Sequence, residues 1–264
     1  MVRARRRRRT ALRWSLLVAL WAGVATALGA TAAFGARWVV APGRFPLTRI
    51  EVVGAREARE SELVDLARGW MGRNILVIDL TEVEAKLREH PWIGPRESGG
   101  TIRIHRHLPG GLLVNITERT VGGMALLNGV VYLVDPWGRP IDRYGPRYAH
   151  HNYPIIVGSV ESLPAGVGLT RALAATHPDL LERVSEIDVF DPHQAVLKFE
   201  EETYDVVLSR EDYTRNLDNY LRMRDVIESE DEGAVQYVDL RWKDRITLMR
   251  APAAPEKNGT NGGS

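Results

Sequence analysis

The residues whose side chains could do chemistry are few and scattered. His105 and His107 alternate along a predicted strand, so their imidazoles would share one face and could begin a metal site. No carboxylate adjoins them, and two ligands fall short of the three or four that zinc needs. Asp135 and Asp142 could form a carboxylate pair for glycan hydrolysis, but Asp135 precedes Pro136 and is typical of a turn. We therefore expect no bound metal and no catalytic pair.

Other candidate sites are weaker still. His150 and His151 are adjacent, and the side chains of neighbouring residues rarely converge on one ligand. The acidic run over 228–232 lacks the spaced ligands and the glycine of a calcium loop, so we interpret it as a solvated helix end. The chain has no cysteine, which excludes disulfides, thiolate nucleophiles and cysteine-ligated metals. It also lacks the common catalytic, phosphate-binding and dinucleotide motifs, so we expect no cofactor and no enzymatic activity.

Length and charge point to an ordinary globular protein with an unusual start. A chain of 264 residues with 44% hydrophobic and 26% charged residues is usual for one or two domains. The net charge is only +1, although seven arginines stand within the first 13 residues. The rest of the chain is therefore net negative, which disfavours a nucleic-acid-binding domain.

An uncharged run follows this basic segment and can cross a membrane. Trp14–Ala36 has 23 residues, or about 34 Å of helix against a hydrocarbon core of about 30 Å. A cleaved signal peptide is the alternative, but its apolar region is usually only about 7 to 15 residues long. Nuclear targeting or RNA binding is the alternative for Arg5–Arg9. The positive-inside rule places the N-terminus in the cytoplasm. The side chains expected to anchor the chain in lipid are Trp14, Leu16, Leu17, Leu20, Trp21, Val24, Leu28 and Trp38.

The segment from 45 to 119 predicts a small mixed unit. Helical periodicity predicts two helices, with Ser61 as the cap of the first and a capping box of Thr81 and Glu84 on the second. Pro91 ends the second helical stretch. Alternating apolar residues predict strands over 47–54, 101–107 and 112–118. The expected order is βααββ.

The segment from 120 to 250 predicts a second unit that is richer in strands. A hairpin over 124–135 turns at Asn128-Gly129. Helices are expected over 169–184 and after Ser209, and the chain closes with one strand that runs from Tyr237 to Met249. Further strands are expected over 153–158, 185–190, 195–200 and 203–209.

Five motifs in this order carry a resemblance to a known family. They are Phe45–Gly54, Asn74–Asp79, His90–Ile93, Leu112–Arg119 and the closing Tyr237–Trp242. With a single span in front of them, they resemble the POTRA module and the β domain of the bacterial cell-division proteins FtsQ and DivIB. The resemblance covers roughly residues 45 to 250. Thr120–Gly123 departs from it, because the family more often has a Pro-Val-Ala type exit there.

The resemblance implies an α+β fold with a single N-terminal transmembrane helix, a βααββ POTRA domain, and a mostly antiparallel β domain with flanking helices. Together with the composition, it divides the chain into a basic cytoplasmic tail (1–13), a transmembrane helix (14–40), a POTRA domain (45–119), an FtsQ-type β domain (120–250) and a disordered tail (251–264).

The resemblance also implies a function. It predicts a non-enzymatic bitopic scaffold at the division septum, in the cell inner membrane, with its C-terminal domains outside the cytoplasm. The implied partners are FtsB-like and FtsL-like single-span proteins and other divisome components. Carried over by position, the partner-binding residues are Tyr237, Asp239, Arg241, Trp242, Lys243, Asp244, Arg245, Ile246 and Leu248.

Addition of a strand to a sheet edge would explain such binding. Val238, Leu240 and Trp242 share one parity and are expected on the inward face. If the closing strand lies at an edge, its backbone groups can pair with a partner strand; the alternative is an internal strand. Two other functions stay open. They are a membrane-anchored cell-wall-associated enzyme and a POTRA-type transport or assembly module, which would need a barrel or repeated POTRA units.

Overall fold

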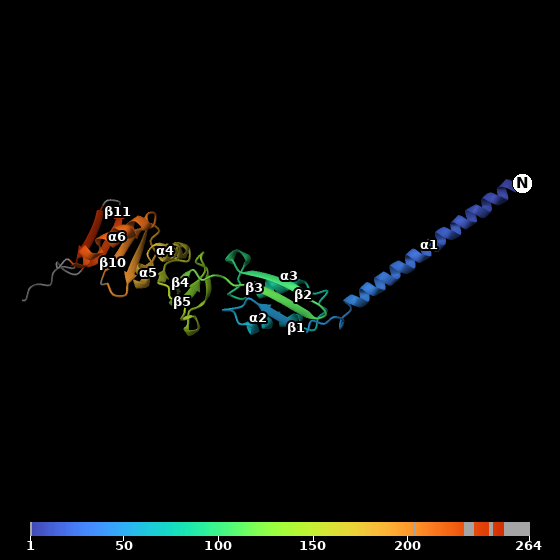
Figure 1. Cartoon of the computed structure of the whole chain (residues 1–264), viewed down its shortest axis with the longest axis horizontal. Helices are drawn as coiled ribbons and strands as arrows, with labels where there is room; N and C mark the ends of the chain where they lie inside the picture. Colours follow the sequence, from blue (N-terminus) through green and yellow to red (C-terminus); the bar gives the residue numbers. More distant parts are fainter. Residues whose placement is uncertain (1, 203, 230–234, 243–244, 251–264) are drawn as a thin grey trace, which may run out of the picture. The chain divides into compact units, whose positions relative to one another are not determined.

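The structure is a computed structural model of the whole chain, and it describes residues 2–202, 204–229, 235–242 and 245–250 (Figure 1). The expected disordered tail, 251–264, lies outside these residues. The described chain divides into two compact units. The first contains residues up to His90 together with Ile102–Thr117, and the second contains Pro91–Thr101 and the chain from Glu118 onward.

Helix α1, Val2–Val40, opens the first unit. It is longer than the expected span, because the helix already begins within the basic segment. Its stretch Leu16–Val40 has 25 residues, with a mean hydropathy of 1.8 in the most apolar window, and none of that window is buried by protein. A long apolar helix without protein around it is consistent with a membrane anchor.

The rest of the first unit has the predicted βααββ order. A three-stranded sheet in the order β1-β3-β2 is formed by β1 (Arg49–Val53), β2 (Thr101–His107) and β3 (Gly111–Thr117). Helices α2 (Glu60–Ala67) and α3 (Leu80–Leu87) bury Leu63 and Leu87 beside it, with a short 3-10 turn η1 (Arg68–Trp70) between them. Strands β1 and β3 pair in parallel, with Arg49 opposite Gly111 and Val53 opposite Asn115.

Both predicted helix caps in this unit are wrong. Helix α2 begins after Arg59 without a side-chain cap. At α3 the cap is Asp79, whose carboxylate accepts a hydrogen bond from the Thr81 backbone N–H at 2.8 Å. Glu84, the expected partner in a capping box, instead forms an ion pair with Arg88 one turn later. The helix starts one residue before Thr81, so Asp79 rather than Thr81 occupies the position where a side-chain oxygen can reach the free N–H groups.

The second unit is built on one nine-stranded sheet in the order β12-β11-β10-β9-β8-β7-β4-β5-β6. Five of its eight pairings are antiparallel, which agrees with the expected fold class. The strands are β4 (Gly123–Leu127), β5 (Val130–Val134), β6 (Pro140–Arg143), β7 (Ile155–Val157), β8 (Val184–Asp188), β9 (Gln194–Phe199), β10 (Asp205–Ser209), β11 (Val235–Trp242) and β12 (Arg245–Arg250).

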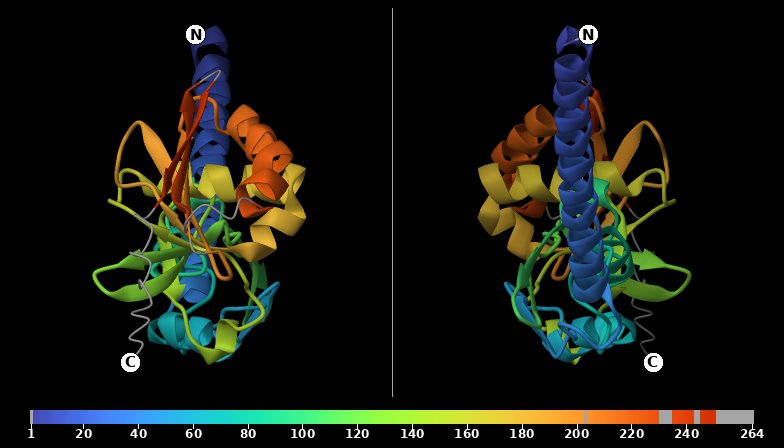
Figure 2. Two further views of the ribbon diagram at one scale, coloured as in Figure 1. Left: turned by 90° about the vertical axis from the view of Figure 1, so that its left-hand side faces the viewer. Right: turned by 90° about the vertical axis from the view of Figure 1, so that its right-hand side faces the viewer.

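Three helices pack on one face of this sheet (Figure 2). They are α4 (Leu163–Thr176), α5 (Pro178–Arg183) and α6 (Tyr213–Ser229); the short 3-10 turns η2 (Arg96–Ser98) and η3 (Pro146–Tyr148) complete the unit. Leu173, Leu217 and Tyr220 belong to a continuous apolar core with apolar residues of β8 and alternate residues of β9 and β10. The alternating burial of β9 and β10 is what the period of two predicted.

A buried ion pair holds the start of the second unit together. The Arg119 guanidinium donates to the Asp135 carboxylate at 2.8 Å, and both side chains are almost fully buried. Arg119 also donates to the backbone oxygens of Pro91, Arg139 and Pro140. Arg119 thus donates to four acceptors on three segments, so Pro91 and its neighbours are fixed to the strands that follow Arg119.

Candidate partner-binding edge

The C-terminal segment forms a hairpin and not the single closing strand that we expected. Strand β11 ends at Trp242 and β12 begins at Arg245, and the two strands pair antiparallel. Lys243 and Asp244, two of the predicted partner-binding residues, lie outside the described residues. The predicted site is therefore spread over two strands with different positions in the sheet.

Strand β11 is internal. It pairs in parallel with β10 on one side and antiparallel with β12 on the other. A strand with two neighbours has no open backbone edge for a partner. Tyr237 and Asp239, two predicted contact residues, thus lie on a strand that cannot itself be extended.

Asp239 and Arg241 form a close pair on β11. Asp239 is buried, and its carboxylate accepts hydrogen bonds from Arg241 Nε at 3.0 Å and from the terminal guanidinium nitrogen at 2.7 Å. The Arg241 hydrogen bonds lower the pKa of Asp239 below its usual range, although burial opposes them. Arg241 also donates to the Gln194 side chain of β9 at 2.8 Å. The pair therefore ties the end of β11 to β9, which lies on the far side of β10 in the sheet.

Trp242 is exposed, which corrects the expected inward face. Val238 and Leu240 are buried as predicted, but 62% of Trp242 is accessible. The pairing of β11 with β12 shifts register between Asp239 and Trp242, and a bulge of this kind changes which side of a sheet the following side chains face. Trp242, the largest of the predicted contact residues, is thus accessible to a partner at the end of β11.

Strand β12 is the last strand of the sheet. Ile246 and Leu248 pack against the core, while Arg245, Thr247 and Met249 are exposed. In the described part of the chain no strand pairs with the outer side of β12. Among the predicted contact residues, Arg245, Ile246 and Leu248 therefore lie on an edge strand, and Trp242 lies beside it.

The opposite edge of the same sheet is built differently. Strand β6 has only four residues and begins with Pro140, which has no N–H to offer a partner. Short strands and proline are common protections of sheet edges. Strand β12 has six residues and no proline. Of the two edges, β12 is the one suited to pairing.

The eight predicted anchor residues all lie on α1 and all are exposed. Trp14 lies near the start of the apolar stretch and Trp38 near its end. Arg44 stacks over the Trp38 ring, 4.1 Å from its centroid. Tryptophan at the two ends of an apolar helix suits the two interfaces of a bilayer.

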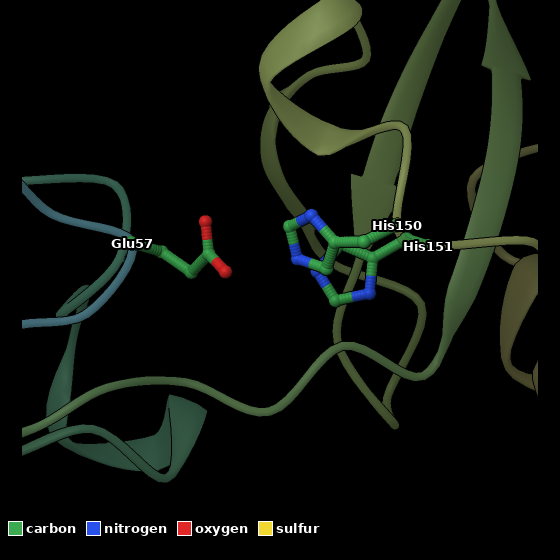
Figure 3. Close-up of side chains that lie close together, drawn as sticks. All are labelled: Glu57, His150 and His151. Carbon is green, nitrogen blue, oxygen red and sulfur yellow. The ribbon is translucent and has the colours of Figure 1, made fainter.

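The candidate metal and catalytic residues form no convincing site. His105 and His107 are exposed on β2. His150 and His151 lie closer than expected, because their ring centroids are 4.2 Å apart (Figure 3). Glu57, also labelled there, belongs to the first unit, whereas both histidines belong to the second. Within the second unit, His150 and His151 therefore offer only two ligands. Asp142 accepts a hydrogen bond from the Tyr148 hydroxyl at 2.7 Å and thus has a structural partner.

The sequence analysis did not identify Arg119 as a structural residue, and it interpreted Asp135 as a turn residue only. Asp135 does form the expected turn, because its carboxylate accepts from the backbone N–H groups of Trp137 and Arg139. Its second oxygen, however, meets Arg119 in the interior. The position of Arg119 directly after the strand motif was visible, but its partner 16 residues later was not.

The comparisons with known proteins agree with this architecture. Residues 45–119 match the family model "POTRA domain, FtsQ-type", and residues 125–241 match "Cell division protein FtsQ/DivIB, C-terminal". A relative from Anaeromyxobacter sp. (strain K), named cell division protein FtsQ, is 30% identical over 96% of this chain and 88% of its own length.

Two further relatives carry the same name. The one from Geotalea daltonii is 27% identical over 78% of this chain and 76% of its own length. The one from Myxococcus fulvus is 28% identical over 57% of this chain, and the match spans 54% of that relative. With both halves matched and a relative aligned almost end to end, the chain belongs to the FtsQ/DivIB family of cell-division proteins.

Proposed function

We propose that the chain is a non-enzymatic, single-pass scaffold of the division machinery, and that β12 is the edge at which a partner adds a strand. The single observation that supports this best is the position of β12 at the end of the nine-stranded sheet, next to an exposed tryptophan. Family membership supplies the cell-division context.

Hydrogen bonds from the β12 backbone would contribute a modest free energy of binding. About half of its six residues direct their N–H and C=O groups away from β11, because an antiparallel ladder uses alternate residues. Up to about six hydrogen bonds at roughly 0.5 to 1.5 kcal/mol each would contribute about 3 to 9 kcal/mol before ordering costs. Two partners anchored in one membrane meet at a high effective concentration, so this contribution can suffice.

Side chains around the edge would give selectivity. Trp242 offers an aromatic anchor of the kind that dominates many interfaces. Arg241 and Arg245 are exposed close to it, and charges on an edge strand discourage indiscriminate pairing. We expect the partner segment to be extended, with an apolar residue opposite Trp242 and acidic residues near the two arginines.

The basic N-terminus and the apolar stretch of α1 support a defined topology. With the arginines in the cytoplasm, the part of the first unit that follows α1 and the whole second unit lie on the outer side of the cell inner membrane. From the resemblance we expect FtsB-like and FtsL-like single-span proteins as the partners and the division septum as the location of the complex. In this proposal Tyr237 and Asp239 do not contact the partner directly. They hold β11 in its place beside β12.

Photo-crosslinking at the two sheet edges tests the proposal. A photoreactive residue is placed at Thr247 on β12 or at Arg143 on β6, both exposed, in the full chain expressed in its own cells. We expect crosslinks to small membrane proteins of the division machinery from position 247 and none from position 143. Equal crosslinking from both edges, or none from position 247 while the partners still co-purify, contradicts docking at β12.

A further inference from the structure

The end of α1 is tied to the rest of the first unit by one buried side chain. Asn74 is almost fully buried, and its amide donates to the backbone oxygens of Val39 at 2.7 Å and Ala41 at 3.3 Å. The last carbonyls of a helix have no partner within the helix, so Asn74 supplies one. The segment around Asn74 is therefore held at the point where α1 ends.

Two more segments meet at the same place. The backbone N–H of Leu47 donates to the Arg73 oxygen at 2.8 Å, and the N–H of Thr48 donates to the Gly110 oxygen at 2.8 Å. The chain after α1, the segment before Asn74 and the β2–β3 turn thus lie together. All three are close to the end of a helix that has the length and composition of a membrane span.

These three segments carry basic residues and no acidic ones. Residues 37–49, 67–78 and 104–111 contain six arginines and two histidines but not one carboxylate. Two of these arginines are already paired with flanking acids, Arg68 with Asp65 and Arg49 with Glu51, while Asp79 caps α3. Apolar side chains are also exposed here, with Met71 41% and Leu108 57% accessible.

We propose that this basal surface, formed by Arg37, Arg44, Met71, Arg73, His107 and Leu108, rests on the headgroups of anionic phospholipids. Exposed arginines beside apolar side chains suit the boundary between phosphate groups and acyl chains. Arg44 already stacks on Trp38, a ring at the interface end of the span. The proposal requires α1 to be inserted in the membrane, but not a particular topology or any property of β12.

The consequence is a first unit that is held against the bilayer surface. A span followed by a loose linker would let the unit tumble, whereas the Asn74 contacts and the basal surface together would fix its height and orientation. Each arginine near an anionic surface strengthens binding about fivefold, and salt screens this attraction.

A single-cysteine fluorescent probe tests the inference, because the chain has no cysteine of its own. The full chain with Met71→Cys carries a polarity-sensitive dye and is reconstituted in nanodiscs of phosphatidylcholine, with or without one-third phosphatidylglycerol. The matched control is Val53→Cys, which is also exposed but lies four residues, or about 13 Å, along β1 from Arg49.

We expect the dye at position 71 to shift to the blue and to resist acrylamide quenching when anionic lipid is present. At about fivefold for each arginine, Arg44→Gln with Arg73→Gln should weaken the apparent binding to anionic lipid about 25-fold. The shift should persist for Arg56→Gln with Arg59→Gln, which removes two charges from the loop after β1. Equal helical circular dichroism of the variants confirms that all of them fold.

Three results would overturn the inference. The first is a dye at position 71 that is equally accessible in both lipids. The second is an equal loss of the shift in both double variants, which would show a general charge effect. The third is a probe that becomes protected only when an acidic soluble protein is added, which would assign the basal surface to a protein partner.

Discussion

Removal of the exposed tryptophan ring at the sheet edge is the sharpest perturbation of the proposed docking site. A tryptophan side chain can bury up to about 250 Å², so its 62% exposure leaves roughly 150 Å² for a partner. At about 25 cal/mol per Å² this area corresponds to about 4 kcal/mol. Incomplete coverage and side-chain ordering reduce the expected loss for Trp242→Ala to about 2 kcal/mol, or about 30-fold in Kd.

Phe190→Ala is the matched control. Phe190 lies in the same unit and is 63% exposed, so the two truncations remove rings that are covered by protein to the same degree. Their effects on the free energy of unfolding should agree to within about 1 kcal/mol. Affinity is measured by titrating the detergent-solubilised full chain with the purified single-span partners, and unfolding by urea. Equal affinities of the two variants would refute the role of Trp242, whatever their stabilities.

Three further predictions concern stability. Arg119→Met leaves the buried Asp135 carboxylate uncompensated and should lower the free energy of unfolding by about 3 to 5 kcal/mol, as measured in urea titrations. The double variant with Asp135→Asn as well should recover part of this loss. A double variant that is no more stable than Arg119→Met alone contradicts the buried-charge explanation. Because the folded-state pKa of Asp239 is lowered, its stabilising contribution is present above the unfolded pKa of about 3.9 and is lost as the pH falls through the folded value. The stability difference between the wild type and Asp239→Asn should therefore shrink below about pH 4; a difference that is independent of pH opposes this assignment. Gly54→Ala would put a Cβ atom 2.2 Å from a backbone oxygen at a φ of +95° and should cost more than about 1 kcal/mol, while Gly69→Ala meets nothing within 4 Å and should be close to neutral in thermal unfolding.

The architecture could be predicted from local patterns. The apolar run before Ala36, the helical periodicity of α2 and α3, and the alternation of β9 and β10 each follow from residues close in sequence. The resemblance to FtsQ and DivIB joined these elements into one known architecture, and the family matches bear out that resemblance. Local signals were sufficient because each of these elements buries one face that its own period defines.

The details of the candidate site could not be predicted in the same way. The break between β11 and β12 and the register shift before Trp242 depend on pairing between strands, which no single-strand pattern reports. Parity therefore placed Trp242 on the inward face, although it is exposed. The Arg119–Asp135 pair was missed for a similar reason, because a buried ion pair depends on which distant segments come together.

Hydrogen exchange of the β12 backbone tests the central proposal most directly. The full chain is compared alone and with its bound single-span partners, and amide protection is followed over Arg245–Arg250. Pairing with an added strand predicts that the alternate amides not bonded to β11 exchange freely in the isolated chain and become protected in the complex. A stable complex in which every β12 amide exchanges as it does in the free chain would contradict strand addition at this edge.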